Sequence, residues 1–451
     1  MINKAGIVLL TILLFPQITI SGSIEYPDKF LLLEILNKGN YESADAIFSS
    51  YQKAYEAGDK EDIISFVFAT FANSSPDLEK RLNSWVDKVP KSYAAKLARG
   101  IYYWNLANLS RGERYIQDTR KEQIQGMRSY FHKSRKDLLA ALKINPKLTA
   151  AYSYLMSIEM RQGDRRSIDA LLERALKVDP ASFVIRGLYM FTLQPKWGGS
   201  LKQMRDFANR SNRYLSRNPK LDILHGYSHY VIADKLRRNG NRKKAKEFYD
   251  QALRYGDYWW FLYERGVNNY LLGDYNNALS DLNKAIALSP QNNQILRWRS
   301  KVYQRQNKLD LALTDINTAL RLDPLDPKQL KTRSFLYKQQ EKYKLAIDDL
   351  DNALIFASSD ANIWSQKGYI YLFKLKDNDK AEEAMLKAIE LNSEYPYYWY
   401  NYGVALYNKM DCKTADAFDN YMKLCDSGKK CKKDLQSWVR QTLPHINAYC
   451  K

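Results

Sequence analysis

Apolar residues recur along most of this chain with the spacing of a helix face, and from Leu262 to Ser393 the pattern repeats every 34 residues. Small residues return at two fixed positions: Gly266, Ser300 and Ser334 at the first, and Ala278, Ala312 and Ala346 at the second. Small side chains are needed where two helices cross closely, and a period of this length is typical of a repeated helical hairpin. The pattern therefore predicts stacked hairpins, in which Pro290 and Pro324 end the second helix of two units.

Over residues 259–410 these positions resemble the tetratricopeptide repeat family. A fourth unit begins near Trp364 with one extra residue in its turn at 374–379, and a fifth begins at Trp399. The resemblance implies an all-α fold, a right-handed α-solenoid of stacked helical hairpins. Such solenoids present an extended concave binding surface, so it also implies a binding protein without naming the partner.

Upstream of the clear repeats the pattern stays helical but is less regular. Residues 24–90 predict short N-terminal helices, and residues 91–256 predict degenerate hairpins of the same type. The segments Ala98–Trp104 and Pro195–Ser200 resemble an uncharacterised bacterial helical domain family that precedes tetratricopeptide repeats in exported proteins. That resemblance covers roughly residues 26–210 and implies no activity.

The start of the chain, residues 1–23, predicts a cleaved secretory signal peptide. Lys4 gives a positive start, residues 5–15 are apolar, and Ser21–Ser23 supplies the small residues that signal peptidase requires. The apolar run is interrupted at Pro16, well short of the about 20 residues that cross a bilayer. We expect cleavage after Gly22 or Ser23, a periplasmic or secreted protein, and no integral membrane span after signal cleavage.

All the cysteines of the chain lie close to its C-terminus: Cys412, Cys425, Cys431 and Cys450. Their spacing lacks the close pairs of structural zinc sites and favours disulfides, which fits export. If Cys412 and Cys425 share one helix, the rise per residue separates them by roughly 20 Å, beyond the reach of a disulfide. The sequence predicts the pairs 425–431 and 412–450 in a cap over residues 411–451. Its final amphipathic helix would cover the open face of the last repeat.

Charge is concentrated in the middle of the chain. Residues 91–256 contain 34 lysines and arginines against 14 aspartates and glutamates, an excess that equals the net +20 of the whole sequence. The densest cluster, the basic patch, surrounds the turn at 239–241 and consists of Lys235, Arg237, Arg238, Arg242, Lys243, Lys244 and Lys246. A positive segment attracts anionic partners, so binding of nucleic acid or an envelope glycan is one hypothesis. The alternative is that these side chains only solvate the outer helix faces.

A second group of residues falls where the first helix of each tetratricopeptide repeat faces the concave groove. Its members are the aromatic Trp260, Tyr263, Tyr369 and Tyr400 and the basic Arg297, Lys301, Lys331 and Lys338. Such a surface suits an extended acidic peptide or a peptide carboxylate, although stacked rings also suit a nucleic acid or a sugar polymer. The carboxylate clamp of the family uses asparagines, which we do not expect on this face.

Motifs for catalysis are missing from the sequence. His225 and His229 lie one helical turn apart but have no third ligand motif, and no nucleophile elbow or dinucleotide fingerprint occurs. We expect no cofactor, no metal and no enzymatic activity. The leading hypothesis is an exported scaffold for protein–protein interaction, with an acidic protein or peptide as its partner. The alternative is a binder of an anionic polymer through residues 91–256.

Overall fold

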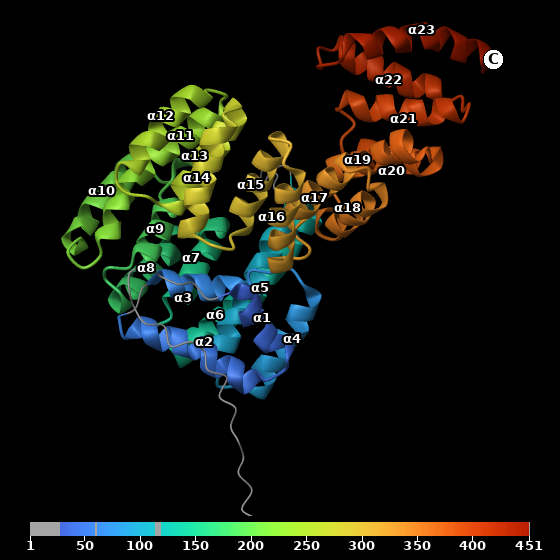
Figure 1. Cartoon of the computed structure of the whole chain (residues 1–451). Coiled ribbons are helices and arrows are strands. Elements are labelled where there is room, and N and C mark those ends of the chain that lie inside the picture. The colour runs from blue at the N-terminus through green and yellow to red at the C-terminus, as the bar shows by residue number, and fades with distance from the viewer. Residues whose placement is uncertain (1–27, 59–60, 113–118, 451) are drawn as a thin grey trace, which may run out of the picture.

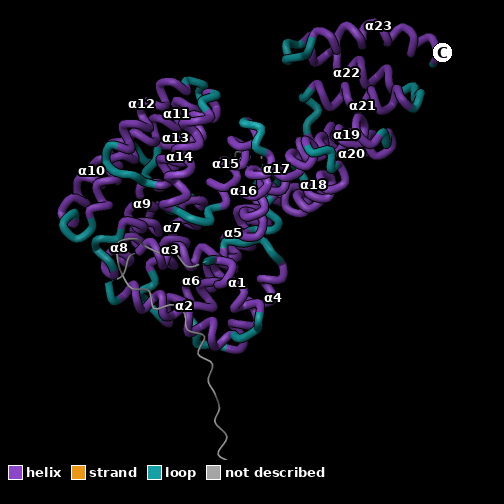
Figure 2. Tube along the Cα trace, in the orientation of Figure 1, coloured by secondary structure: helices purple, strands orange, loops and turns teal. Residues whose placement is uncertain are grey.

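The computed structural model describes residues 28–58, 61–112 and 119–450. Over this part of the chain only helices and their connections occur, without strands (Figures 1 and 2). The predicted all-α solenoid of stacked helical hairpins is confirmed. The predicted signal peptide, residues 1–23, lies outside the described residues.

Four helices precede the hairpins: α1 (Lys29–Asn37), α2 (Tyr41–Glu56), α3 (Glu61–Phe68) and α4 (Pro76–Lys88). Their apolar faces meet in an aromatic core, where the Phe48 ring lies 4.9 Å from Phe71 and 5.5 Å from Trp85 between ring centroids. Polar side chains start the helices, since Asp28 and Asn40 accept backbone N–H groups of the first turns of α1 and α2.

The basic region forms less regular hairpins, whose helices range from 10 to 24 residues in length. They are α5 (Tyr93–Arg111), α6 (Lys121–Ile144), α7 (Thr149–Gln162), α8 (Arg165–Val178), α9 (Phe183–Thr192), α10 (Leu201–Ser211), α11 (Gly226–Arg238) and α12 (Arg242–Leu253). At Gly100 an added Cβ would lie 2.9 Å from the Leu138 side chain. Glycine is therefore what lets α5 and α6 cross this closely.

The repeat array follows with further paired helices. They are α13 (Trp259–Leu272), α14 (Tyr275–Leu288), α15 (Asn293–Arg305), α16 (Leu309–Leu322), α17 (Pro327–Gln339), α18 (Tyr343–Ala357), α19 (Ala361–Ile370), α20 (Asn378–Leu391), α21 (Pro396–Asn408) and α22 (Thr414–Asp426). Ala312 and Ala346 are fully buried. The Ser300 hydroxyl donates to the Ala312 carbonyl at 2.7 Å, and Ser334 does the same to Ala346 at 2.8 Å. The predicted positions of close crossing are confirmed.

The turns within the hairpins share one backbone conformation. Gly273, Asn307, Glu341 and Met410 have positive φ, and the last three carry a side chain in a region that costs about 1–2 kcal/mol. In the fourth unit the extra residue is accommodated by a π-helix (Tyr371–Leu375), after which Lys376 takes the positive-φ position.

The hairpins curve round until α18 lies against α5, while the helices that follow α18 form an arm that points away (Figure 1). The N-terminal helices close this curve by contacts with the end of α16 and with the turn before α15. The Ser74 N–H donates to Asp323 Oδ1 at 2.8 Å, and the Lys29 N–H donates to Gln291 Oε1 at 2.9 Å. We call these contacts the N-terminal clasp.

The chain ends in α23 (Lys433–Tyr449), which packs Val439 and Ile446 against Phe418 and Tyr421 of α22. Disulfides join Cys425 to Cys431 and Cys412 to Cys450, with Cα–Cα distances of 5.6 Å in both. Both predicted pairs and the capping helix are confirmed.

Candidate binding groove

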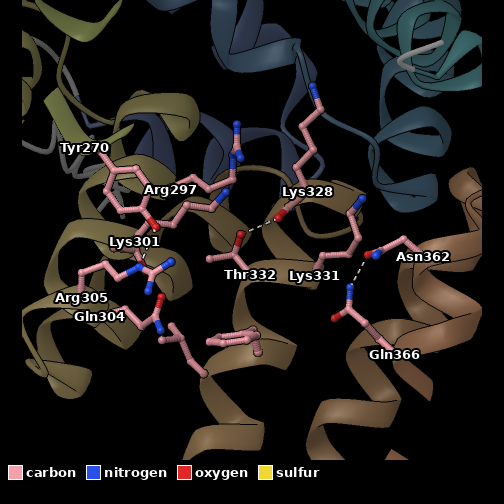
Figure 3. Close-up of a pocket in the computed structure, with 13 residues that line it drawn as sticks. Tyr270, Arg297, Lys301, Gln304, Arg305, Lys328, Lys331, Thr332, Asn362 and Gln366 are labelled. Atoms are coloured by element: carbon pink, nitrogen blue, oxygen red, sulfur yellow. Dashed lines mark hydrogen bonds between the residues drawn. The ribbon is translucent and has the colours of Figure 1, made fainter. Parts of the chain in front are cut away.

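A groove of about 410 Å³ lies on the inner side of the repeat array, between α13, α15, α17 and α19 (Figure 3). Each of these is the first helix of its hairpin, so equivalent positions in successive repeats face the same space. Five cations line the groove: Arg297, Lys301, Arg305, Lys328 and Lys331. We call this surface the cationic groove.

Acidic side chains are absent from the described residues that line the groove. One carboxylate reaches it from the start of α19, where Asp360 contacts Lys331 at 2.7 Å. Arg305 donates from Nε to the Tyr270 hydroxyl at 3.2 Å, which positions it without neutralising it. The Nε of Arg297 is buried and has no hydrogen-bond partner among the described residues. The lining therefore has a positive potential that favours carboxylates.

Polar uncharged groups complete the lining. The Thr332 hydroxyl donates to the Lys328 carbonyl at 2.8 Å, and Gln366 Nε2 donates to Asn362 Oδ1 at 2.5 Å (Figure 3). The expectation that this face lacks asparagine is wrong, because Asn362 lines the groove beside Lys331. Amide groups next to cations suit the backbone of an extended peptide as well as its carboxylates.

The structure brings Arg297, Lys301 and Lys331 together, as the sequence predicts for a shared face. Lys338 and Tyr369 are neighbours just beyond the groove lining, with the ammonium 5.1 Å from the ring centroid. Burial, and then the nearby Lys374, lower the pKa of Lys338. These positions are consistent with a ligand surface, and their role in binding stays a prediction.

Three predicted aromatic residues belong to packed clusters instead. Tyr263 is buried against Trp260, with ring centroids 5.5 Å apart, and burial raises its pKa to about 12. Tyr400 packs against Phe418 and Tyr421 in the core of the cap. The sequence position is correct for each, but neighbouring helices cover the rings.

The basic patch is less available than its composition suggests. Arg237 is held between Asp234 and Glu264 at 2.7 and 3.0 Å, Arg238 contacts Asp234, and Lys246 contacts Asp250. Arg242 donates to the Leu271 carbonyl at 3.0 Å. Burial raises the pKa of Glu264 to about 7 although Arg237 favours its ionised form. Lys235, Lys243 and Lys244 remain exposed at the turn.

A recurring ion pair, which we call the Arg–Asp ladder, was not predicted from the sequence. In each rung an arginine of the first helix contacts, with two nitrogens, an aspartate in the second helix of the same hairpin. The rungs are Arg265–Asp281, Arg299–Asp315 and Arg333–Asp349. The third arginine nitrogen reaches back to the preceding hairpin, at Asp250, Asn283 and Asn317 respectively. The signal was present, because the arginines and the aspartates recur with the same period as the small residues.

The histidines that could suggest a metal site have other contacts. His225 Nε2 lies 2.9 Å from Asn212 Oδ1, and His229 stacks on Tyr255 at 6.0 Å between centroids. Among the described residues no three histidine, cysteine or acidic side chains gather in a geometry that could hold a metal ion.

Known family models match two parts of the chain. A domain of unknown function, DUF4034, matches residues 31–165. Tetratricopeptide repeat families match residues 230–293, 263–327 and 361–395. Both predicted resemblances are confirmed. The DUF4034 match crosses the boundary expected between residues 90 and 91, and the division into 24–90, 91–256 and 259–410 stays a prediction.

Solved structures with a similar arrangement are remote in sequence. The hetero-tetramer of the APC/C proteins Cut9 and Hcn1 is 13% identical, with a TM-score of 0.47, over 93% of this chain and 89% of that one. MamA from Desulfovibrio magneticus RS-1 is 22% identical, with a TM-score of 0.36, over 39% of this chain and 99% of that one. No curated protein matches the chain.

Proposed function

Because the chain is a tetratricopeptide repeat protein, we propose that it is a non-catalytic scaffold that binds an extended acidic segment of another protein in the cationic groove. One observation carries this proposal: five cations from the first helices of two successive repeats line the groove, and no described lining residue is acidic. Carboxylates paired with lysine and arginine form the strong, charge-assisted class of hydrogen bond.

The dimensions favour a peptide of moderate length. Four neighbouring first helices spaced by about 8–10 Å span roughly 25–30 Å, which an extended chain covers with about eight or nine residues. Each carboxylate that pairs with a half-exposed cation contributes about 1 kcal/mol after solvent screening. Five such pairs acting together give about 5 kcal/mol, a weak submillimolar complex, which suits a reversible scaffold.

An anionic polymer receives less support. Three members of the basic patch pair with carboxylates, and another donates to a backbone carbonyl. The patch is therefore a useful control surface. Variants of its exposed lysines change the charge of the protein as much as variants of the groove do.

Export is the second part of the proposal. We infer that residues 1–23 are removed and that the mature chain works in the periplasm or outside the cell. The two disulfides of the cap support an oxidising compartment, and no described helix is long and apolar enough to cross a membrane. Amino-terminal sequencing of the protein from its native host tests this. Sequence starting at Ser23 or Ile24 is expected, and an intact Met1 in the cell interior would contradict it.

The binding proposal is tested with a fluorescent ten-residue peptide rich in aspartate and glutamate, compared with its asparagine and glutamine counterpart. Fluorescence polarisation with the full chain should detect submillimolar binding of the acidic peptide but not of its uncharged counterpart, and this binding should weaken as salt is raised. Arg297→Gln with Lys301→Gln should weaken it by about tenfold or more, since two charge-assisted contacts are lost.

Lys243→Gln with Lys244→Gln is the matched control, because it removes the same charge from exposed positions of the basic patch. It should leave the affinity within about twofold. If the acidic peptide does not bind, or if the control weakens binding as much as the groove variant, the proposal fails.

A further inference from the structure

The groove changes character along its length. The lining is cationic on α15 and at the start of α17. Two exposed aromatic side chains, Phe335 on α17 and Tyr369 on α19, lie at the other end, and each is 39% exposed. Phe335 itself lines the cationic groove, and Tyr369 follows on the next repeat. The Lys338 ammonium lies between them, 4.8 Å from the Phe335 centroid and 5.1 Å from the Tyr369 centroid. We call these three residues the aromatic shelf.

The repeat places the shelf and the cations in one line. Lys301, Phe335 and Tyr369 are each one repeat apart, so they hold equivalent positions on α15, α17 and α19. The equivalent residue of α13, Val267, is buried. Along a single row of the groove the surface therefore passes from buried apolar to cationic and then to exposed aromatic.

Local contacts hold the shelf in this form. Tyr369 also packs on Phe373 with 4.9 Å between centroids, which restrains its ring. The cation–π contacts hold the Lys338 ammonium beside the two rings, next to the cationic groove. Two ordered rings that stay exposed beside a charged groove offer a site for an apolar side chain at low entropic cost.

We propose that the groove recognises a two-part segment of a partner protein, in which acidic residues over α15 and α17 are accompanied by an aromatic or large aliphatic residue that covers Phe335 and Tyr369. This inference rests on the proposed function, because the acidic part of the segment sets its position. The cations of the groove complement acidic side chains, and the exposed rings continue the same line of repeat positions. We therefore expect one ligand, an extended segment that carries both acidic residues and an apolar residue.

The structure also sets the spacing within the segment. Lys331 precedes Phe335 by one helical turn, about 5.4 Å, and Tyr369 lies on the next first helix about 8–10 Å away. Together, the two offsets place Tyr369 roughly 10–12 Å from Lys331. An extended peptide covers this distance in about three or four residues. The apolar residue should therefore follow or precede the last acidic residue at that spacing.

The test uses four ten-residue peptides on the full chain: an acidic peptide, the same peptide with phenylalanine four residues after the acidic run, one with phenylalanine four residues before it, and one with phenylalanine directly beside it. One of the two spaced peptides should bind about tenfold more tightly than the acidic peptide, since covering an aromatic ring contributes on that scale. The adjacent phenylalanine should give no comparable gain.

In Phe335→Ala with Tyr369→Ala this gain should disappear, so that the spaced peptides and the acidic peptide bind the variant with the same affinity. The matched control is Trp197→Ala, which removes an exposed ring from the turn before α10 and should preserve the gain. The inference is overturned if the acidic peptide binds but neither spaced phenylalanine helps, or if the gain survives the double alanine variant. Failure of every peptide to bind would instead refute the proposed function and the inference with it.

Discussion

Removal of one carboxylate from the Arg–Asp ladder should loosen the array locally. In the central rung, Arg299 donates from Nε and from Nη2 to the two oxygens of Asp315, both at 2.8 Å. The Asp315 side chain is 7% exposed and that of Arg299 is 20% exposed. Asp315→Ala therefore leaves a mostly buried guanidinium whose remaining contacts among the described residues include a hydrogen bond to Asn283 and the Tyr303 ring at 5.8 Å.

The size of the effect follows from this exposure. Two charge-assisted hydrogen bonds are worth about 1.5–3 kcal/mol each, and loss of one partner of a fully buried pair costs about 3–5 kcal/mol. Water reaches one side of Arg299, so we expect a loss of about 2–3 kcal/mol in local stability. The surface pair of Glu390 with Lys387 sets the comparison, because both side chains are about half exposed and removal of Glu390 should cost under about 1 kcal/mol.

Hydrogen exchange is the suitable assay, since solenoid repeats open locally and a single melting curve averages over them. Backbone amides of α15 and α16 should exchange about 30- to 150-fold faster in Asp315→Ala, because each 1.4 kcal/mol is a factor of about ten. Arg299→Met combined with Asp315→Leu should recover most of the protection, since an apolar pair replaces the charges. If Glu390→Ala accelerates exchange around its own position as much as Asp315→Ala does around Asp315, the reasoning is refuted.

Three further outcomes are expected. Thiol titration of the denatured, unreduced protein should find no free thiol, because all cysteines are paired; four reactive thiols would contradict the cap. Ala312→Arg should unfold the surrounding hairpins, since it forces volume and charge into a fully buried crossing, and a wild-type circular dichroism melt would show the crossing to be misplaced. Burial raises the pKa of Asp323 in the clasp to about 7, so its contribution to stability is complete below the unfolded pKa of about 4 and is lost as pH rises through 7. Denaturant titrations should therefore show stability falling between pH 4 and 7, and Asp323→Asn should reduce this slope while leaving the part that Glu264 contributes.

Features that repeat, or that follow from helix geometry, were predictable from the sequence. Ser300 with Ala312 and Ser334 with Ala346 are recognisable because small residues recur once per repeat, and the structure places them at close crossings. The rise per residue of a helix was sufficient to exclude a bond between Cys412 and Cys425. The same period identified the row of cations in the groove.

Features that join different elements were not predictable in this way. The positions equivalent to Lys328 in other repeats are occupied by Trp260, Gln294 and Asn362. Because these residues share no charge or polarity, the repeat pattern did not identify Lys328 as a groove residue. The Arg–Asp ladder is an intermediate case, because its arginines and aspartates recur once per repeat but their pairing between two helices was obscured by the many other charged residues. The clasp joins Ser74 to Asp323, far apart in the chain, and no periodicity relates the two. Contacts of this kind depend on how far the solenoid curves, which its sequence period does not determine.

The clasp holds the turn that leads into α17, a helix that lines the groove, and this position gives the clasp a consequence for the proposed binding. Asp323 follows the end of α16, and Asp326 caps the start of α17 by accepting the N–H groups of Lys328 and Gln329. The N-terminal helices hold the α16–α17 turn through Ser74, whose hydroxyl also accepts the Leu325 N–H at 3.2 Å. Because Lys328 and Lys331 lie in the first two turns of α17, the segment that positions these cations is itself anchored from the far end of the chain. A site held rigid before its ligand arrives loses less entropy on binding. The N-terminal helices therefore contribute to the groove by fixing its geometry, although none of their described residues lines it.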